Sequence, residues 1–227
     1  ASCYTLEMAR QGVIGFAFTN SDALVAPLHG TAPLFGTNPL SIAAEGEGGD
    51  LFCADLATSQ VSYSKVKHHR ENGLPLQPGW AVAADGTDVA TGAARDGEVA
   101  ALQPLGGHKG QCLGMAVEIL CALLAGMPLD HELSHLYVAP FDEPRRVAHL
   151  FLALDPAAFP GASAGDTAAT FRSRLSGLLG LVRAQPAVAG ERVVVPGDLE
   201  RESAEARRAA GIPLGPEDLA WFTDITD

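Results

Sequence analysis

Short apolar segments, separated by polar or Gly/Pro-rich stretches, recur along the chain and predict β-strands. The segments 13–19 and 51–56 are apolar runs of strand length, and the polar residues Thr19-Asn20-Ser21-Asp22 end the first of them. The stretch 46–50, Gly-Glu-Gly-Gly-Asp, has the composition of a hairpin loop. We therefore expect strands at 13–19, 40–44, 51–56, 147–154 and 193–195.

Helical periodicity predicts a second set of elements. The strongest signal follows residue 110, where Leu113, Val117, Leu120 and Leu124 repeat at helical spacing and form the stripe expected to face the core. A final helix is expected to be capped by Asp198 and ended by Gly211. The other predicted helices are 2–11, 57–70 and 167–184, and 73–97 is predicted as a long surface loop.

Strands that alternate with helices indicate an α/β protein. No G-x-G-x-x-G follows a predicted strand, which argues against a Rossmann fold. The length of 227 residues corresponds to one large domain or two small ones, and a hydrophobic content of 47% is sufficient for a core.

The chain carries 15 Lys and Arg against 27 Asp and Glu, a net charge of -12. Because a surface this acidic repels a phosphate backbone, a nucleic acid is not expected as a partner. It also repels small anions at long range. Any anion site must therefore be a local concentration of hydrogen-bond donors and positive charge.

The cysteines and the longest apolar run indicate a cytoplasmic protein that does not enter a membrane. No CxxC pair occurs, which predicts reduced thiols rather than disulfides. The apolar run 113–124 is interrupted by Glu118 and is too short to span a bilayer. Three cysteines lie in apolar segments, where cysteine behaves as a small hydrophobe: Cys53, Cys112 and Cys121.

The first candidate for chemistry is the Gly-rich turn 105–110, Leu-Gly-Gly-His-Lys-Gly, which leads into the strong helix. A helix N-terminus offers unpaired N–H groups and a partial positive charge, and glycine lets a phosphate approach the backbone. Lys109 adds a full charge, and His108 stands beside it. The alternative is a tight turn with a solvated lysine, and the spacing is not that of a Walker A loop.

Two further candidates are polar groups at element ends. Asp55 stands at the carboxyl end of an apolar strand, where open α/β sheets place ligand-contacting groups, or it caps the following helix. Gly36-Thr37-Asn38-Pro39 carries a turn signal.

His131-Glu132-Leu133-Ser134-His135 is a literal HExxH. On a helix, His131 and His135 would share one face and could hold zinc, with Glu132 as the base of a hydrolase. Pro128 and Pro140 leave room for barely three helical turns, and the extended downstream pattern is absent. We therefore expect no metal here.

The order of these fragments along the chain resembles the malate/L-lactate dehydrogenase family of type 2. This family includes ureidoglycolate, diketo-gulonate and sulfolactate dehydrogenases and the piperideine/pyrroline-2-carboxylate reductases, and the resemblance extends over essentially the whole chain. The fragments that carry it are Thr19-Asn20-Ser21, Leu34-Phe35-Gly36-Thr37-Asn38-Pro39, Asp55-Leu56-Ala57-Thr58-Ser59, Gly79-Trp80, 104–110, 151–156 and Val195-Pro196-Gly197-Asp198.

The resemblance implies a homodimeric enzyme with a non-Rossmann NAD(P)-binding fold, in which helices flank a mixed sheet. Residues 1–146 would form the cofactor-binding domain, and 147–227 would pack back on an N-terminal domain. Hydride would pass between NAD or NADP and C2 of a small 2-oxo or 2-hydroxy acid or a cyclic 2-imino acid. Asp55 would be the catalytic partner of a histidine. The implied cofactor contacts are Ser21, Thr37, Asn38, Asp55, Leu56, Ala57, Ser59, His108, Lys109, Gly197 and Asp198.

Two departures from the family pattern matter. The catalytic histidine and the substrate-binding arginine of the family belong to an upstream region with no counterpart here, so we expect an N-terminal segment or companion chain to supply them. The loop 83–93 lacks the usual Pro-Thr and Asp-Pro, and Ser64-Lys65 replaces the common Gly-Lys. The rival hypotheses are the zinc hydrolase and a catalytically inactive family member that acts as a binding subunit.

Overall fold

The structure is a computed structural model that describes residues 1–90, 99–136, 138, 141–159, 167–215, 219 and 221–222. The predicted surface loop 73–97, and within it the loop 83–93 that departs from the family pattern, therefore lie partly outside the described residues.

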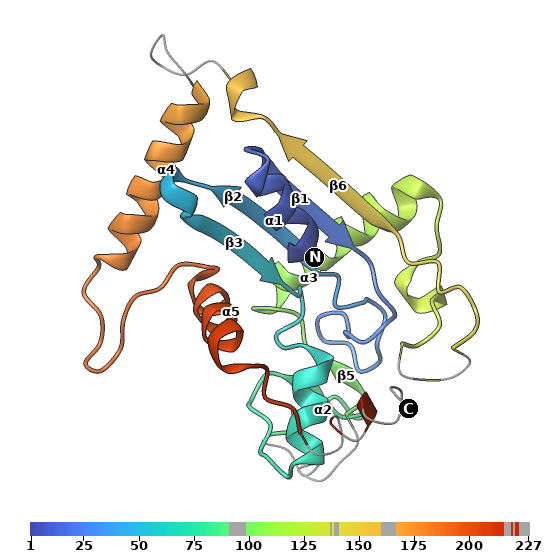
Figure 1. Cartoon of the computed structure of the whole chain (residues 1–227). Coiled ribbons are helices and arrows are strands. Elements are labelled where there is room, and N and C mark those ends of the chain that lie inside the picture. The colour runs from blue at the N-terminus through green and yellow to red at the C-terminus, as the bar shows by residue number, and fades with distance from the viewer. Residues whose placement is uncertain are drawn as a thin grey trace.

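A four-stranded antiparallel sheet forms the centre of the molecule, in the order β3-β2-β1-β6 (Figure 1). Within it, Phe16 of β1 lies opposite Ile42 of β2 on one side and Leu152 of β6 on the other. Four of the five predicted strands are confirmed to within two residues. Their bounds are β1 Ile14–Thr19, β2 Leu40–Glu45, β3 Leu51–Leu56 and β6 His149–Leu154.

The predicted strand 193–195 is wrong. The residues form no ladder, and it is the neighbouring Pro196 that meets the sheet, where its carbonyl accepts a hydrogen bond from the Cys53 N–H at 3.0 Å. This contact satisfies one N–H group on the outer edge of β3. Because proline has no N–H to donate in return, it does not extend the sheet.

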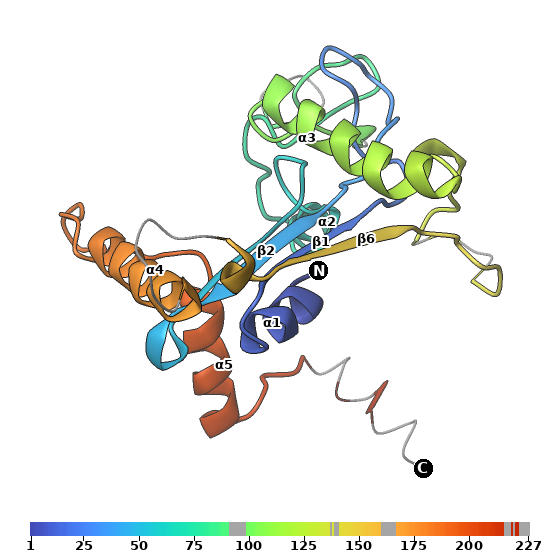
Figure 2. The ribbon, with the colours of Figure 1, turned by 90° about the horizontal axis from the view of Figure 1, so that it is seen from above.

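Helices cover both faces of the sheet, α1 on one side and α3 on the other (Figure 2). Gly15 lets α1 approach closely, since a Cβ at this position would stand 2.7 Å from the Cβ of Met8. On the opposite face Phe18 packs against Val117 and Cys121. The bounds are α1 Ser2–Arg10 and α3 His108–Glu118, which continues as a π-helical turn at Ile119–Leu123.

The orientation of α3 corrects the sequence prediction. Of the predicted core stripe only Val117 is buried, whereas Leu113, Leu120 and Leu124 are exposed, Leu124 to 71%. Small residues face the interior instead, at Gly110, Gly114, Val117 and Cys121.

Close approach of neighbouring backbone explains this choice. A Cβ on Gly110 would stand 2.2 Å from the Leu105 nitrogen and 2.6 Å from the Thr58 carbonyl oxygen. A Cβ on Gly114 would stand 3.1 Å from the Thr58 hydroxyl. Large side chains do not fit on this face of α3, so the leucines lie on the other.

A second hydrophobic cluster, larger than the one between the sheet and α3, lies beyond the end of the sheet, around α2 and the two-stranded ribbon β4-β5 (Figure 1). Val25, Val66 and Leu102 form part of its core. The predicted start of this helix at residue 57 is wrong, because Ser59 pairs with Pro104 as a β-bridge and the helix begins after Ser62. The bounds are α2 Tyr63–Glu71, β4 Ala81–Val82 and β5 Ala101–Leu102.

The C-terminal part contributes two helices, which Arg183 joins to the sheet. Its guanidinium donates to Asp50 at 2.9 and 3.0 Å and to Asp198 at 2.8 and 3.0 Å. The bounds are α4 Thr167–Arg183 and α5 Asp198–Ala210, and the short 3-10 helices are η1 Glu47–Gly49, η3 Asp130–Glu132 and η4 Pro156–Ala158.

The predicted end of α5 is confirmed, since Gly211 adopts a φ of 88° there. The predicted cap is wrong. Gly197 is the N-cap residue of α5, while the Asp198 carboxylate accepts the N–H of Val195 at 3.1 Å. The hydrogen bonds from Arg183 hold the pKa of Asp198 well below its usual range.

The α/β class with helices on a sheet is confirmed. Among the described residues the four-stranded sheet contains only antiparallel pairs, and the parallel component is the single bridge between Val25 and Leu102. β6 pairs directly with β1, so a boundary at residue 146 passes through the sheet, and the two-part division stays a prediction. No helix in the described part of the chain combines the length and apolar character needed to cross a membrane.

We predict that Gly110→Ala destabilises the protein by about 3 kcal/mol, because its methyl group meets rigid backbone rather than a movable side chain. Gly180→Ala, in α4 with nothing within 4 Å of its added Cβ, should stabilise the protein by about 0.5 kcal/mol through helix propensity. Chemical denaturation measures both. Equal effects of the two substitutions would contradict the close packing of α3.

Candidate functional site

Three loops converge at the end of the sheet where β3 finishes, and Thr58 connects them. Its N–H and hydroxyl both donate to the carbonyl of Thr37, at 2.8 and 3.0 Å. Its own carbonyl accepts the N–H of Leu105 at 2.9 Å. The turns 36–38, 56–59 and 104–110 are therefore fixed against one another.

The beginnings of α2 and α3 also meet in this region. The Gln60 side chain accepts the N–H of Gly106 at 3.0 Å, and the Gln60 N–H donates to Gln103. Gly106 and Gly107 have φ values of 57° and 69°, the left-handed region that glycine adopts without strain. The positive ends of two helix dipoles thus lie close together.

The N-terminus of α3 has the features required of an anion site. Gly107 is its N-cap residue and provides no side-chain cap, and His108 and Lys109 are both exposed. Within the described part of the chain Lys109 forms no ion pair. An exposed Lys109 agrees both with the predicted anion site and with the alternative of a tight turn with a solvated lysine.

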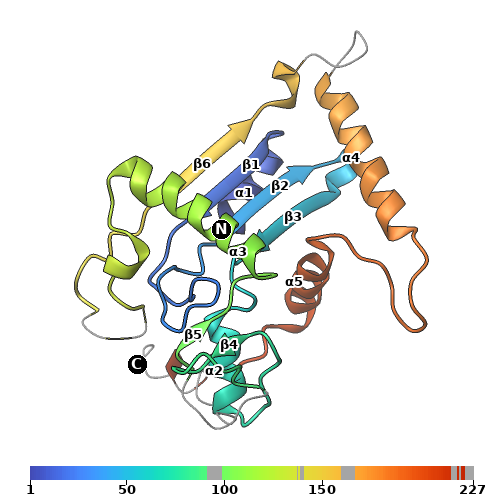
Figure 3. The same cartoon turned by 180° about the vertical axis from the view of Figure 1, so that it is seen from behind.

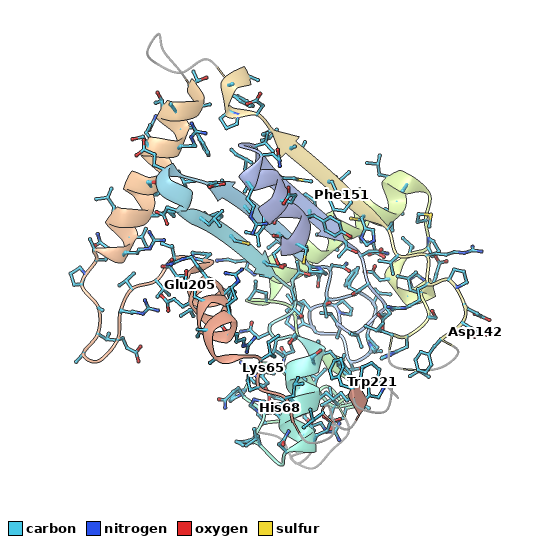
Figure 4. All side chains as sticks on the ribbon, viewed as in Figure 1. Lys65, His68, Asp142, Phe151, Glu205 and Trp221 are labelled. Carbon is cyan, nitrogen blue, oxygen red and sulfur yellow. The ribbon has the colours of Figure 1, made fainter. Side chains whose placement is uncertain are left out.

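Sequence reasoning missed how the lysines are distributed. The chain contains three lysines, and all of them lie on α2 or on the first turn of α3: Lys65, Lys67 and Lys109. Lys65 projects from α2 (Figure 4), with its ammonium over the Trp80 ring at 5.2 Å from the centroid. The placement of the lysines was visible in the sequence, but only the fold brings α2 next to the Gly-rich turn.

A buried polar network positions the loops that precede the site. Asn38 is fully buried, with its side-chain oxygen accepting the Ser21 N–H at 3.1 Å. Its amide donates to the Gly114 carbonyl at 3.0 Å and to the Asp130 carboxylate at 2.7 Å. Asp130 also accepts the Gly36 N–H at 2.8 Å. The network therefore joins the turn 36–38 to α3.

The network contains two buried carboxyl groups, and the pKa of each is raised. Burial raises the pKa of Asp130, and hydrogen bonds from Gly36 and Asn38 offset only part of that effect. Burial likewise raises the pKa of Glu118, whose carboxylate accepts the Asp130 N–H at 3.0 Å. The second oxygen of Asp130, Oδ1, accepts no hydrogen bond from the described residues. A protonated carboxyl group is therefore favoured in this network more than in water.

Asp55 lies at the same end of the sheet as the Gly-rich turn, but on the face that α1 covers. Its Oδ2 accepts hydrogen bonds from the N-terminal ammonium of Ala1 at 3.2 Å and from the Ser2 N–H at 2.8 Å. Burial acts to raise the pKa of Asp55, but hydrogen bonds from Ser2 and the nearby positive charge outweigh it and lower the pKa. The alternative that Asp55 caps the next helix is wrong, because that helix begins at Tyr63.

The predicted cofactor contacts fall into two groups. The first group surrounds the three converging loops, where the Ser21 hydroxyl accepts the Thr37 N–H at 3.0 Å. Leu56 is exposed and Ala57 half-buried, whereas Ser59 is buried and donates to the Val61 carbonyl. The members of this group are Ser21, Thr37, Asn38, Asp55, Leu56, Ala57, Ser59, His108 and Lys109.

The second group, Gly197 and Asp198, lies beside the middle of β3. A Cβ at Gly197 would stand 3.2 Å from the Cys53 nitrogen, so the turn packs tightly on the strand edge. The Asp198 carboxylate is buried and bonded to Arg183. Its role in cofactor binding stays a prediction.

The helix required by the zinc hypothesis does not form. Residues Asp130–Glu132 make a single 3-10 turn and Leu133 is extended, so His131 and His135 do not share a helical face. The Glu132 carboxylate accepts the Leu129 N–H at 2.8 Å, and His135 lies 3.7 Å from Asp22. Within the described ranges no group of three His, Cys, Asp or Glu residues is arranged to hold a metal ion. The HExxH match therefore corresponds to no metal centre here.

Comparison with known proteins finds relatives along nearly the whole chain. A family model described as malate/L-lactate dehydrogenase matches residues 1–222. The (2R)-3-sulfolactate dehydrogenase (NADP(+)) of Chromohalobacter salexigens is 34% identical over 169 residues, which are 74% of this chain and 50% of that protein. The Delta(1)-pyrroline-2-carboxylate reductase of Ancylobacter novellus is 34% identical over 203 residues, 89% of this chain and 56% of that protein.

Solved structures agree with these relatives. A dehydrogenase from Sinorhizobium meliloti has a TM-score of 0.81 and 33% sequence identity, over 99% of this chain and 62% of that one. The chain spans about half the length of the curated relatives that it matches.

We predict that Asn38→Ala destabilises the protein by about 3 kcal/mol, because it removes a partner from the buried carboxyl group of Asp130. Asn72→Ala, which removes an exposed asparagine bonded to His68, should cost less than about 1 kcal/mol. Denaturation curves compare the two variants. A small loss for Asn38→Ala would show that the network does not hold the loops.

Asn38→Asp tests the electrostatics of the same position, since it places a second carboxyl group beside Asp130. Each group raises the pKa of the other, so the folded variant holds a proton that the unfolded chain, with a carboxyl pKa of about 3.9, releases. The free energy of unfolding of the variant should therefore fall as the pH rises from about 4 through the raised pKa. A variant no more sensitive than the wild type to pH in this range would contradict the assignment.

Proposed function

The chain belongs to the malate/L-lactate dehydrogenase family, and on this basis we propose that it forms the dinucleotide-binding part of an NAD(P)-dependent oxidoreductase. The reaction is hydride transfer to or from C2 of a small 2-oxo or 2-hydroxy acid or a cyclic 2-imino acid. The names of the relatives support both substrate classes, since one is a sulfolactate dehydrogenase and another a pyrroline-2-carboxylate reductase.

One observation carries the proposal: the uncapped, glycine-rich N-terminus of α3 lies beside the start of α2, with Lys109 exposed next to it. The N–H groups of Gly106, Gly107 and Gly110 already donate to Gln60, Pro104 and Leu105, so the diphosphate of a dinucleotide is held by the start of α3 at His108 and Lys109, with the two helix dipoles beside it. The overall charge of -12 makes this concentration of positive charge more selective. The fold that holds the cofactor is not of the Rossmann type.

The described residues bind and orient rather than perform the redox step. The nicotinamide ring supplies or accepts the hydride when it is bound. Ser21, Thr37 and Asn38 belong to loops held against α3, because Asn38 bonds both to Ser21 and to the Gly114 carbonyl in α3. Leu56 and Ala57 connect Asp55 to Thr58, whose N–H is hydrogen-bonded to the Thr37 carbonyl.

Asp55 acts as a positioning residue for proton transfer. A carboxylate with a lowered pKa is ionised at neutral pH and stabilises the protonated form of a histidine that it contacts. We propose that a segment outside residues 1–227 supplies this histidine. Two observations support this: Asp55 lies against the N-terminus of α1, and the chain spans about half of its relatives.

We predict that Lys109→Ala weakens cofactor binding about tenfold, the loss of one charge-assisted contact. Arg208→Ala, which removes an exposed positive charge from the last turn of α5, should leave the affinity unchanged. Titration of the 227-residue chain with NADH and with NADPH, followed by nicotinamide fluorescence, measures both.

Two outcomes would decide against the proposal. If the wild-type chain binds neither nucleotide, the anion site is not a dinucleotide site. If binding occurs and a protein that includes the upstream segment still shows no turnover, the chain is an inactive binding subunit instead.

A further inference from the structure

The first turn of α1 has no capping side chain of its own. Ala1 is the N-cap residue and has no side-chain oxygen to accept a backbone N–H, and the first turn contains no acidic residue. The acceptor comes from β3 instead, where Oδ2 of Asp55 accepts the Ser2 N–H at 2.8 Å. A carboxylate that lies 53 residues further along the chain thus takes the place of the usual N-cap side chain.

A second polar contact fixes the position of α1 on the sheet. Ser2 and Thr5 are three residues apart and therefore lie on the same side of the helix. Thr5 and Ser41 are both fully buried, and their hydroxyl oxygens lie 2.7 Å apart. Ser41 is directly opposite Asp55 in the β2-β3 ladder, so both side chains are on the face that α1 covers. The contact at Thr5 therefore holds α1 where Ser2 contacts Asp55.

Close packing continues along the helix. In Figure 1 α1 lies in front of the sheet and in Figure 3 behind it, and in both views the N-terminus is near the end of β3. A Cβ at Gly15 of β1 would stand 3.0 Å from the Thr5 carbonyl oxygen. The start of α1 is therefore held at the end of β3 by packing beyond its first turn, and the Ser2 contact does not depend on its own hydrogen bond alone.

Ser2 affects the ionisation of Asp55 through two groups. Burial acts to raise the pKa of Asp55, and hydrogen bonds from the Ser2 hydroxyl and the Ser2 N–H are the strongest effects that lower it. The positive end of the α1 dipole acts in the same direction. The Ala1 ammonium also lowers the pKa, but in a protein that continues upstream of Ala1 this nitrogen is an uncharged amide. Ser2 and the helix dipole then stabilise the carboxylate without it.

The contacts from α1 leave one oxygen of Asp55 accessible. The Ala1 nitrogen and the Ser2 N–H both bind Oδ2, at 3.2 and 2.8 Å. A histidine N–H can therefore bind Oδ1 without displacing either contact. The Asp55 side chain is 30% exposed, so a group from outside the described residues can reach it.

We propose that Ser2 is a positioning residue for the proton-transfer step: together with the N-terminus of α1 it fixes the Asp55 carboxylate and leaves Oδ1 to bind the histidine. The inference rests on the proposed function, because it requires the role proposed there for Asp55. Ser2 acts only through this carboxylate and exchanges no proton with the substrate.

Substitutions at position 2 test the contact directly. Ser2→Ala removes the hydroxyl, whereas Ser2→Pro removes the hydroxyl and the N–H at a helix position that accommodates proline well. The pKa of Asp55, followed by carbon-13 NMR of its carboxyl group in the 227-residue chain, should rise in Ser2→Ala and rise further in Ser2→Pro. Ser2→Thr should keep the wild-type value.

Ser176→Ala is the matched control, because the Ser176 hydroxyl accepts the Glu47 N–H at 2.8 Å near the opposite end of β3. It should leave the pKa of Asp55 unchanged. An Asp55 pKa that is the same in the wild type, Ser2→Ala and Ser2→Pro would overturn the proposal, whether or not the chain binds a nucleotide.

Steady-state kinetics of a protein that includes the upstream segment test the role in the reaction. Activity that requires an ionised Asp55 falls as the pH drops through its pKa, so a raised pKa moves this loss to higher pH. Ser2→Ala should show that shift, with kcat lowered about tenfold and KM little changed, and Ser2→Thr should restore both.

A double substitution separates this inference from the proposed function. In an Asp55→Asn background, Ser2→Ala should have no further effect on kcat, because Ser2 acts through the carboxylate. If Asp55→Asn lowers kcat but Ser2→Ala leaves the pH profile unshifted, the role of Ser2 is wrong and that of Asp55 stands. If Asp55→Asn retains the wild-type kcat, the proposed role of Asp55 fails, and the inference fails with it.

Discussion

The buried carboxyl group of Asp130 is the contact on which the arrangement of this molecule depends. It accepts the Gly36 N–H and the Asn38 amide, while Asn38 reaches the Gly114 carbonyl in α3. Burying a carboxyl group is costly, and hydrogen bonds offset that cost only when the donors are held in place. The same bonds therefore specify where the turn 36–38 lies relative to α3. Thr58 donates hydrogen bonds to the carbonyl of Thr37, which fixes the loop after β3 relative to the turn 36–38. The N–H of Leu105 donates to the Thr58 carbonyl, which fixes the Gly-rich turn in the same way.

The two sides of the helix α3 differ in residue size. Gly110 and Gly114 let the neighbouring loop approach closely, which places the helix N-terminus at the end of the sheet. The large apolar residues are thereby displaced to the outer side, where they remain exposed on the single chain. An exposed stripe of leucines is unfavourable in water, so close packing on the inner side of α3 is accompanied by a destabilising exposure of apolar surface on its outer side.

The acidic composition gives the proposed anion site its selectivity. Most of the surface repels negative ligands, and the three lysines lie on α2 and on the first turn of α3. Local donors can overcome the long-range field only when several act together. Asp55 lies on the other face of the same sheet end, so the proposed proton-transfer residue and the proposed phosphate site are on opposite faces of the sheet.

The sequence by itself determined the four central strands and the existence of α1, α3, α4 and α5, and it predicted the Gly-rich turn and the Asp55 segment as site residues. These features follow from local periodicity, glycine positions and motif order, which require no knowledge of neighbours. Only the tertiary structure decided which side of α3 is buried, since Leu113 and Gly114 are adjacent in sequence and the choice between them depends on the Thr58 loop. It also decided that the HExxH segment is not helical and that Asp198 bonds to Arg183 instead of capping α5. For α3 and for Asp198 the deciding partner, Thr58 or Arg183, is distant in the chain, and contacts at that separation leave no periodic pattern in the sequence.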